Sequence, residues 1–463
     1  MKNACDASTS SDLCCSRIAP LSSTVDTSDA QPRRAPRYSR VDELFDKSQP
    51  RAMWTWKKVA QATSGRVADL AHGPSCAQSR LRLFGASEKD VRVTLFRDHH
   101  AWCPYCQKIW LWLEEKRVPY RVKKVTMFCY GEKESWYKRI VPSGMLPAVE
   151  LDGRIVTESD VILERLEATF GPLVHKMNDR DVVACRRLER HLFGAWCEWL
   201  CRPQRSAAAE QRSRAQFEAV ADAVEDLLAR RPGAFFLGDE FTTADVVFVP
   251  YVERMSASLF YYKGFRLRDP AARPRLCAWF DNLETREAYL GTQSDFHTHC
   301  HDLPPQMGGC YESGDAAQAA ARDLVDARAG GVPAETTAPV PDDAALVAAA
   351  RVCQFRSQIA AVNGELADAA AVDGALLAAV ANLLDGGTAA APPPGTAAAL
   401  RYVRDRVNVP RDMPIHSARA LCAALEATAA LDSAAAPRSK IRLKDRRDQD
   451  PRPFQSAGVR VTA

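Results

Sequence analysis

Two cysteines three positions apart, Cys103 and Cys106, are the residues of this sequence best suited to chemistry. They lie between an extended apolar run and a helical one, in RDHHAWCPYCQKIWLWLEEK (97–116). Such a pair can be a reactive thiol pair, two metal ligands, or two buried small hydrophobic residues. A zinc site usually needs a second Cys or His pair, and the sequence has no second CxxC. The spacing and context therefore favour a redox or conjugating thiol.

The position of Cys103 predicts which thiol attacks. A residue just before the first turn of a helix faces unpaired N–H groups and the positive end of the helix dipole. Pro104 suits the first helical position, because its missing N–H costs nothing there. We therefore expect Cys103 to be an exposed nucleophile and Cys106, one turn later, to resolve a mixed disulfide.

The predictions for the residues that flank the cysteines are weaker. His99 and His100 can tune the thiol as cations, or they can simply form a polar loop between strand and helix. Trp102 is expected to shape the cleft beside Cys103 rather than to react.

A second stretch could hold a peptide-like ligand, VPSGMLPAVELDGRIVTESDVILERL (141–166). Pro147 directly precedes a strand, where a cis bond is plausible and would leave the Leu146 backbone free to pair with an extended peptide. Glu158 and Ser159 stand just before and at the start of a helix. The N–H groups there can hold a carboxylate, and Glu158 can hold an ammonium group. Ser159 can equally be an N-cap, and the two roles are compatible.

The stretch FHTHCHD (296–302) raises the question of a metal. In an extended segment His297, His299 and His301 would point to one side, near Cys300 and Cys310, which suits zinc or copper. No carboxylate at a suitable spacing completes a known site. We therefore predict no metal ligand, and expect these histidines to be partly exposed hydrogen-bonding groups or to line an acceptor cleft.

The elements that position these residues can be predicted from the sequence pattern. Strands at 91–96 and 120–126 flank a helix at 104–116, and a hairpin turns at Asp152–Gly153 before a helix at 159–171. This predicts a thioredoxin-like βαβ–ββα domain over residues 88–172. Amphipathic helices follow, one of them opened by Thr242 and Asp245 in a capping box, with Phe241 and Val246 as a hydrophobic staple. They predict an all-α domain over residues 178–290.

The remaining segments carry fewer signals. We expect a mostly disordered N-terminal extension (1–87), a loop rich in His, Cys and Gly (291–315), an Ala-rich helical extension (316–435) and a disordered tail (436–463). A transit peptide is possible at the start, although such peptides contain few acidic residues and Asp6, Asp12, Asp26 and Asp29 are present.

Composition excludes several classes of protein. The formal net charge is only +4 over 463 residues and the basic residues are not clustered, which argues against a nucleic-acid partner. No window reaches about 18 consecutive apolar residues, so no membrane span is expected. The sequence has 15 cysteines but no apolar signal segment, so we expect reduced thiols in an intracellular compartment.

Four motifs in this order resemble the glutathione transferase superfamily. They are a glutaredoxin-like CPYC, then SGMLPAVELDG, then ESDVILERL, then LGDEFTTADVVFVPYV, within about residues 90–285. A cysteine at the active position is similar to the omega, lambda and dehydroascorbate reductase-type classes. The whole chain looks like a plant and algal, often plastid-type, branch with a C-terminal extension.

The resemblance implies a function and its residues. Cys103 would form a mixed disulfide with glutathione, the co-substrate. The Leu146 backbone beside Pro147 would pair with the cysteinyl part of glutathione, and Glu158 and Ser159 would bind the γ-glutamyl end.

Other implications of the resemblance leave alternatives open. Lys133 resembles the family lysine that meets the glycyl carboxylate, or it is a solvated surface charge. Cys106 leaves open whether turnover uses one thiol or two. The acceptor would be a small or protein disulfide, or an electrophile that is conjugated. A non-catalytic scaffold is a further alternative. A homodimer is possible, in the cytoplasm or a plastid.

Overall fold

The computed structural model describes residues 54–66, 69–328, 330–333, 335–363, 366–386 and 390–434. The predictions for residues 1–53 and for the tail at 436–463 lie outside these ranges.

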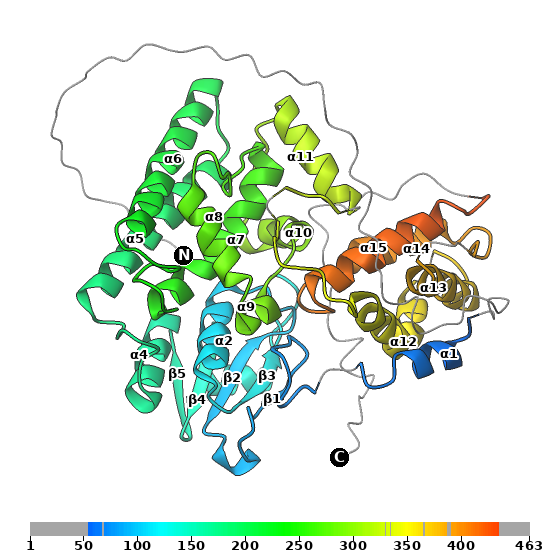
Figure 1. Ribbon diagram of the computed structural model, residues 1–463, viewed down its shortest axis with the longest axis horizontal. Helices are drawn as coiled ribbons and strands as arrows, with labels where there is room; N and C mark the ends of the chain where they lie inside the picture. The colour runs from blue at the N-terminus through cyan, green and yellow to red at the C-terminus, as the bar shows by residue number, and fades with distance from the viewer. Residues whose placement is uncertain are drawn as a thin grey trace. The chain divides into compact units, whose positions relative to one another are not determined.

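One mixed sheet of five strands forms within the described residues, in the order β1-β3-β2-β4-β5 (Figure 1). Strands β2 and β3 are parallel, and the other neighbouring pairs are antiparallel. The strands are β1 (Leu81–Arg82), β2 (Val93–Asp98), β3 (Tyr120–Val125), β4 (Ala148–Leu151) and β5 (Arg154–Thr157).

Three helices connect or follow these strands, after a 3₁₀ turn at Glu88–Asp90. Helix α2 (Pro104–Lys116) joins the parallel strands β2 and β3, α3 (Ser135–Ile140) precedes β4, and α4 (Ser159–Phe170) follows β5. This arrangement confirms the predicted thioredoxin-like βαβ–ββα domain. Strand β1 was not predicted, because two residues are too few to show a period in the sequence.

Local sequence explains the ends of several elements. Asp152 and Gly153 both have positive φ, 50° and 77°, which the tight turn between β4 and β5 requires. Helix α4 ends at Gly171, also at positive φ, as the sequence predicts.

Six helices follow in the all-α part of the chain. They are α5 (Arg180–Leu200), α6 (Ala207–Ala229), α7 (Thr243–Lys263), α8 (Pro274–Leu283), α9 (Glu287–Thr292) and α10 (Phe296–Met307). The central helix α7 begins with the predicted capping box of Thr242 and Asp245, and Phe241 and Val246 are both buried beside it. Trp112 of α2 and Phe248 of α7 belong to one continuous hydrophobic core, so the sheet and the helices share it.

The prediction of a loop over residues 291–315 is wrong for Phe296–Met307. This segment is the helix α10, which begins at Asp295, whose carboxylate accepts the Thr298 N–H at 2.8 Å. The turn-forming residues suggested a loop, but Pro304 and Pro305 fall late in the helix and Gly308 follows its end at positive φ.

The predicted helical extension is present as α11 (Ala316–Ala327), α12 (Ala344–Val362), α13 (Ala369–Leu384), α14 (Ala397–Arg406) and α15 (Ile415–Ala429). The last four helices build a second hydrophobic core of their own.

The prediction of a mostly disordered segment before residue 88 is wrong for residues 54–62. Helix α1 (Trp56–Ala62) places Val59 in the core of the extension. The indole of Trp54 donates to Asp385 at 3.0 Å, and that of Trp56 donates to Asp373 at 2.9 Å. This short helix gains its stability from tertiary packing, which the local sequence does not reveal.

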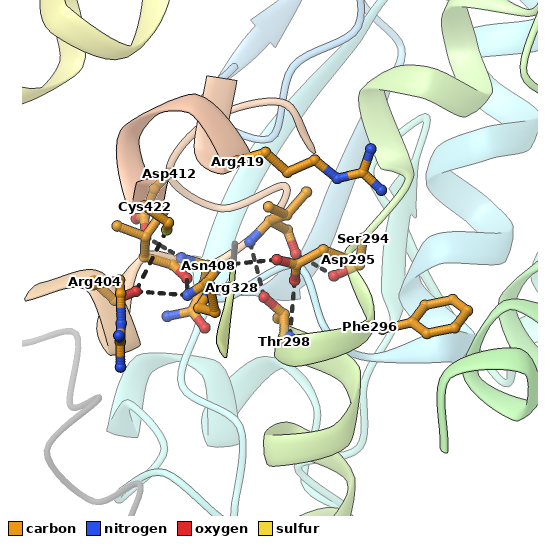
Figure 2. A network of polar contacts seen from close by, with 12 residues as sticks. Ser294, Asp295, Phe296, Thr298, Arg328, Arg404, Asn408, Asp412, Arg419 and Cys422 are labelled. Atoms are coloured by element: carbon orange, nitrogen blue, oxygen red, sulfur yellow. Dashed lines mark hydrogen bonds and ion pairs between the residues drawn. The ribbon is translucent and has the colours of Figure 1, made fainter. Parts of the chain in front are cut away.

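A buried polar network joins the extension to α10 (Figure 2). Arg328, which caps α11, donates to Asp295 at 2.8 Å and to the carbonyls of Arg404 and Val407 at 2.7 Å each. The hydroxyl of Thr298 accepts the Val409 N–H at 3.1 Å. One guanidinium thus holds the beginning of α10 and the end of α14 together.

Candidate active site

Cys103 is the N-cap residue of α2, and Pro104 is the first helical residue. Cys106 lies in the first turn of the same helix, and both cysteines are free thiols. The prediction that Cys103 is exposed is wrong, because Cys103 is only 7% exposed and Cys106 only 1%. The two thiols pack with Trp102, Met127 and Tyr130, contacts that sequence spacing does not reveal.

The two thiols have different environments. Burial, with a hydrogen bond to Cys103 as a smaller cause, raises the pKa of Cys106 well above its ordinary value. Cys106 is therefore a protonated thiol at neutral pH. Cys103, by contrast, stands where the first N–H groups of α2 have no partner within the helix.

Asp98, at the end of β2, was not singled out from the sequence. It is fully buried, and its Oδ2 accepts the Trp102 N–H at 2.7 Å. Its Oδ1 has no hydrogen-bond partner among the described residues. One carboxylate oxygen of Asp98 and the two sulfurs all lie within 4.8 Å of one another. Three such donors could hold a metal ion, but a structural zinc site usually has four protein ligands, so the site fits thiol chemistry better.

Arg254, on α7, fixes the start of α2 against the helical domain. It is 1% exposed, and it donates to the Trp102 carbonyl at 2.6 Å and to the Gln107 side chain at 2.7 Å. The sequence predicted nothing for this arginine, because the contact joins residues about 150 positions apart. Its effect is to hold the residues on both sides of the cysteines in place.

Aromatic rings close one side of the cysteine pair. His100 stacks on Trp102 with 4.4 Å between ring centroids, and Tyr130 meets the Trp102 ring edge-on at 5.2 Å. The guanidinium of Arg411, from the extension, lies 5.6 Å from the centroid of Trp102. Trp102 is fully buried in this cluster, so it supports the site from behind and does not line an open cleft.

His99 does not supply a positive charge at neutral pH. Burial, and to a smaller degree the charge of Lys124, lowers the pKa of His99 to about 4. Its contact with Glu134, at 3.5 Å, is therefore made by a neutral ring. The idea that His99 tunes the thiol as a cation is wrong, because desolvation outweighs the nearby carboxylates.

Lys133 is half-buried and is not a freely solvated surface charge. Its Nζ donates to the Thr126 carbonyl at 3.0 Å and lies 5.9 Å from the centroid of the Tyr137 ring. Burial lowers the pKa of Lys133, and the nearby thiols of Cys106 and Cys103 partly oppose this shift.

The remaining candidates lie on the segment that leads into β4 and α4. The Leu146–Pro147 peptide bond is cis, and the Leu146 side chain packs against the cluster that contains Cys103. Glu158 is the N-cap residue of α4, and Ser159 is the first residue of that helix. The interpretation of Ser159 as the N-cap is therefore wrong by one position.

Glu158 has an unusual backbone. Its φ is +66° with ψ at 113°, a region that L-residues other than Asn and Asp rarely adopt. The side chain is exposed and makes no capping hydrogen bond. Backbone strain of this kind concentrates at functional sites, and the binding role of Glu158 stays a prediction.

The described chain thus combines a thioredoxin-like sheet, with a cysteine at the start of its first connecting helix, and an all-helical domain. Residues 102–169 match the family model of the glutathione S-transferase N-terminal domain. Residues 207–282 match that of the glutathione S-transferase C-terminal domain. These two segments of the chain therefore resemble the two domains of glutathione S-transferases, and neither match reaches the extension.

The chain is also similar to several named proteins. Glutathione S-transferase DHAR3, chloroplastic, of Arabidopsis thaliana is 27% identical over 194 residues, which cover 42% of this chain and 69% of the relative. Glutathione S-transferase L3 of the same plant is 26% identical over 200 residues, covering 42% and 79%. Among solved structures, glutathione transferase Omega 3C from Trametes versicolor is 28% identical, with a TM-score of 0.38, covering 44% of this chain and 90% of that one.

Within the described residues, every helix is too short or too polar to cross a bilayer.

Proposed function

We propose that this protein is a glutathione-dependent thiol transferase or oxidoreductase that works through Cys103. The observation that carries the proposal is the position of Cys103 at the N-terminus of α2, packed with Cys106 and Leu146. The unpaired N–H groups there stabilise a thiolate, and Leu146 belongs to the segment that would pair with glutathione. The named relatives are glutathione S-transferases, which supports glutathione as co-substrate.

The first step would be attack of the Cys103 thiolate on the glutathionyl sulfur of a mixed disulfide. The new S–S bond forms as the old one breaks, and the leaving thiolate takes a proton from solvent. A second glutathione thiolate then attacks the Cys103–glutathione disulfide, which yields oxidised glutathione and restores the Cys103 thiolate. An acceptor of the dehydroascorbate type would receive the same two electrons from two glutathione molecules.

Cys106 offers a second way to complete the cycle. Its thiolate would attack the Cys103 sulfur, release glutathione, and leave a Cys103–Cys106 disulfide for two further glutathione molecules to reduce. Because the pKa of Cys106 is high, this route needs a proton acceptor. A carboxylate oxygen of Asp98, which lies within 4.8 Å of both sulfurs, is suited to take that proton.

Five residues would hold the glutathione molecule. The Leu146 backbone beside Pro147 would pair with its cysteinyl part, and Lys133 would meet the glycyl carboxylate. Glu158 would bind the γ-glutamyl ammonium group, and the N–H groups at Ser159 would bind its carboxylate. Lys133 is half-buried and donates to the Thr126 carbonyl at 3.0 Å, which holds its ammonium group in a fixed position and supports its place in this group.

Conjugation of glutathione to an electrophile is the second candidate, since it would use the same site. Two assays separate the candidates: reduction of hydroxyethyl disulfide and conjugation of chlorodinitrobenzene, each with glutathione. The proposed function predicts a kcat/KM at least about tenfold higher for the disulfide than for the electrophile. The reverse ratio would establish conjugation, and no turnover in either assay would favour a non-catalytic scaffold. A homodimer, and a location in the cytoplasm or a plastid, remain predictions; one relative is named chloroplastic.

The strained backbone of Glu158 gives a test of the binding site. We expect Glu158→Gly to raise the KM for glutathione about tenfold, because the carboxylate is lost. The same change should raise the free energy of unfolding by about 1 kcal/mol, because glycine adopts a positive φ without strain. Glutathione titration and urea unfolding measure the two effects.

The matched control is Glu164→Gly, an exposed position in the middle of α4. It should lower the free energy of unfolding by about 1 kcal/mol, the cost of glycine in a helix interior, and leave the KM unchanged. A Glu158→Gly variant with an unchanged KM would show that this carboxylate does not bind glutathione.

A further inference from the structure

A second cluster of chemically capable side chains lies away from the cysteine pair, between α10 and α11. His297 and His301 are four positions apart on α10, which places them on one face of that helix. Asp326 of α11 faces them. One ring nitrogen of each histidine and one carboxylate oxygen of Asp326 all lie within 4.8 Å of one another.

The contacts of the cluster show how tightly it is arranged. The His301 Nε2 and an oxygen of Asp326 are 2.8 Å apart, and the centroids of the two imidazole rings are 4.4 Å apart. Both histidines are almost fully buried, at 3% and 1% exposure. The hydroxyl of Tyr261 donates to the other oxygen of Asp326 at 3.0 Å, which orients the carboxylate from outside the cluster.

His299 does not belong to this cluster. Because α10 is a helix, His299 points to a different face, where its Nε2 lies 2.7 Å from Glu253. The sequence pattern suggested three histidines on one side of an extended segment with no carboxylate. In the structure, only His297 and His301 lie together, and the third member of the cluster is Asp326, 25 residues beyond His301.

We propose that His297, His301 and Asp326 bind one divalent transition-metal ion of the zinc class. Imidazole nitrogens and a carboxylate oxygen are ligands that such ions prefer, at about 2.0–2.2 Å from the metal. Ligand atoms around a tetrahedral ion are roughly 3.3 Å apart. Side-chain movements of about 1 Å would therefore bring the two ring nitrogens and the carboxylate oxygen to coordinating distance from one ion. Tyr261 is the outer partner that metal-binding carboxylates usually have.

The position of the three ligands suits an ion that holds two segments together. His297 also lines a small cavity with Val325, Arg328 and Cys422. Two of the ligands belong to α10, in the transferase part, and the third belongs to α11, the first helix of the extension. The bound ion would fasten the beginning of the extension to the helical domain, a role separate from the proposed glutathione chemistry.

The test uses the full-length chain with Cys103→Ser and Cys106→Ser, because Asp98 and the two cysteines also cluster within 4.8 Å. The protein is stripped with a chelator and titrated with Zn²⁺ by calorimetry, then with Co²⁺ by visible absorption. Co²⁺ bound through thiolates shows an intense near-ultraviolet band, which a site of imidazole and carboxylate lacks. We expect one equivalent of metal and no such band.

Single substitutions identify which side chains bind the metal ion. Asp326→Asn and His297→Ala are each expected to weaken Zn²⁺ binding by at least about 100-fold. His191→Ala, an exposed histidine of α5, should leave the affinity unchanged. Asp326→Asn keeps the shape of the side chain, so it preserves the test if His297→Ala fails to fold. The proposal is overturned if the chain with Cys103→Ser and Cys106→Ser binds no metal, if its Co²⁺ spectrum shows thiolate ligands, or if Asp326→Asn binds Zn²⁺ as tightly as the parent.

Discussion

Cys103→Ser should lower glutathione-dependent reduction of hydroxyethyl disulfide by about 10³-fold or more. A serine hydroxyl keeps the size of the residue but cannot form a mixed disulfide. The helix N-terminus cannot compensate for this loss, because the step requires a sulfur that is attacked and released. Steady-state assays measure the rate, and intact mass after incubation with oxidised glutathione should show a single added glutathione on the parent and none on the variant.

Cys106→Ser is the matched control, since it removes a thiol from the same turn of α2. If a second glutathione completes the cycle, this variant should keep activity within about tenfold of the parent and accumulate the glutathione adduct. A loss equal to that of Cys103→Ser would instead assign turnover to the cysteine pair. Full activity in Cys103→Ser would contradict the proposed function.

Arg328→Met should lower the free energy of unfolding by about 3–5 kcal/mol, the usual cost of breaking a buried ion pair by removing one partner. The substitution would leave the buried carboxylate of Asp295 without its cation. It would also leave the carbonyls of Arg404 and Val407 without the two N–H donors shown in Figure 2. Urea unfolding followed by tryptophan fluorescence and circular dichroism measures the change.

Arg322→Met, on the same helix α11, is the matched control. Arg322 is partly exposed and pairs with Glu312 at 3.0 Å, so its loss should cost less than about 1 kcal/mol. Limited proteolysis adds a second measurement: the Arg328 variant should be cleaved faster around residues 328–340 than the Arg322 variant. Equal unfolding midpoints for the two variants would show that the buried network does not stabilise the junction.

The sequence by itself determined the thioredoxin-like order of elements, the position of Cys103 at a helix start and the capping box of α7. These features depend on local patterns: alternation of apolar residues, a proline at the first helical position, and an Asp-Gly turn. The four motifs that resemble glutathione transferases could be recognised for the same reason, because each motif is a continuous stretch of the sequence.

Only the tertiary structure decided how the cysteines are surrounded and which histidines meet. The burial of Cys103, the neutral state of His99 and the free oxygen of Asp98 depend on residues packed from β3, α7 and the extension. Arg254 and Trp102 are about 150 residues apart in the chain, and His301 and Asp326 lie on different helices. The α1 helix is held in place because Trp56, its first residue, and Trp54, just before it, donate hydrogen bonds to residues more than 300 positions away. A local pattern carries no signal for such contacts, because burial and charge pairing depend on which distant segments the fold brings together.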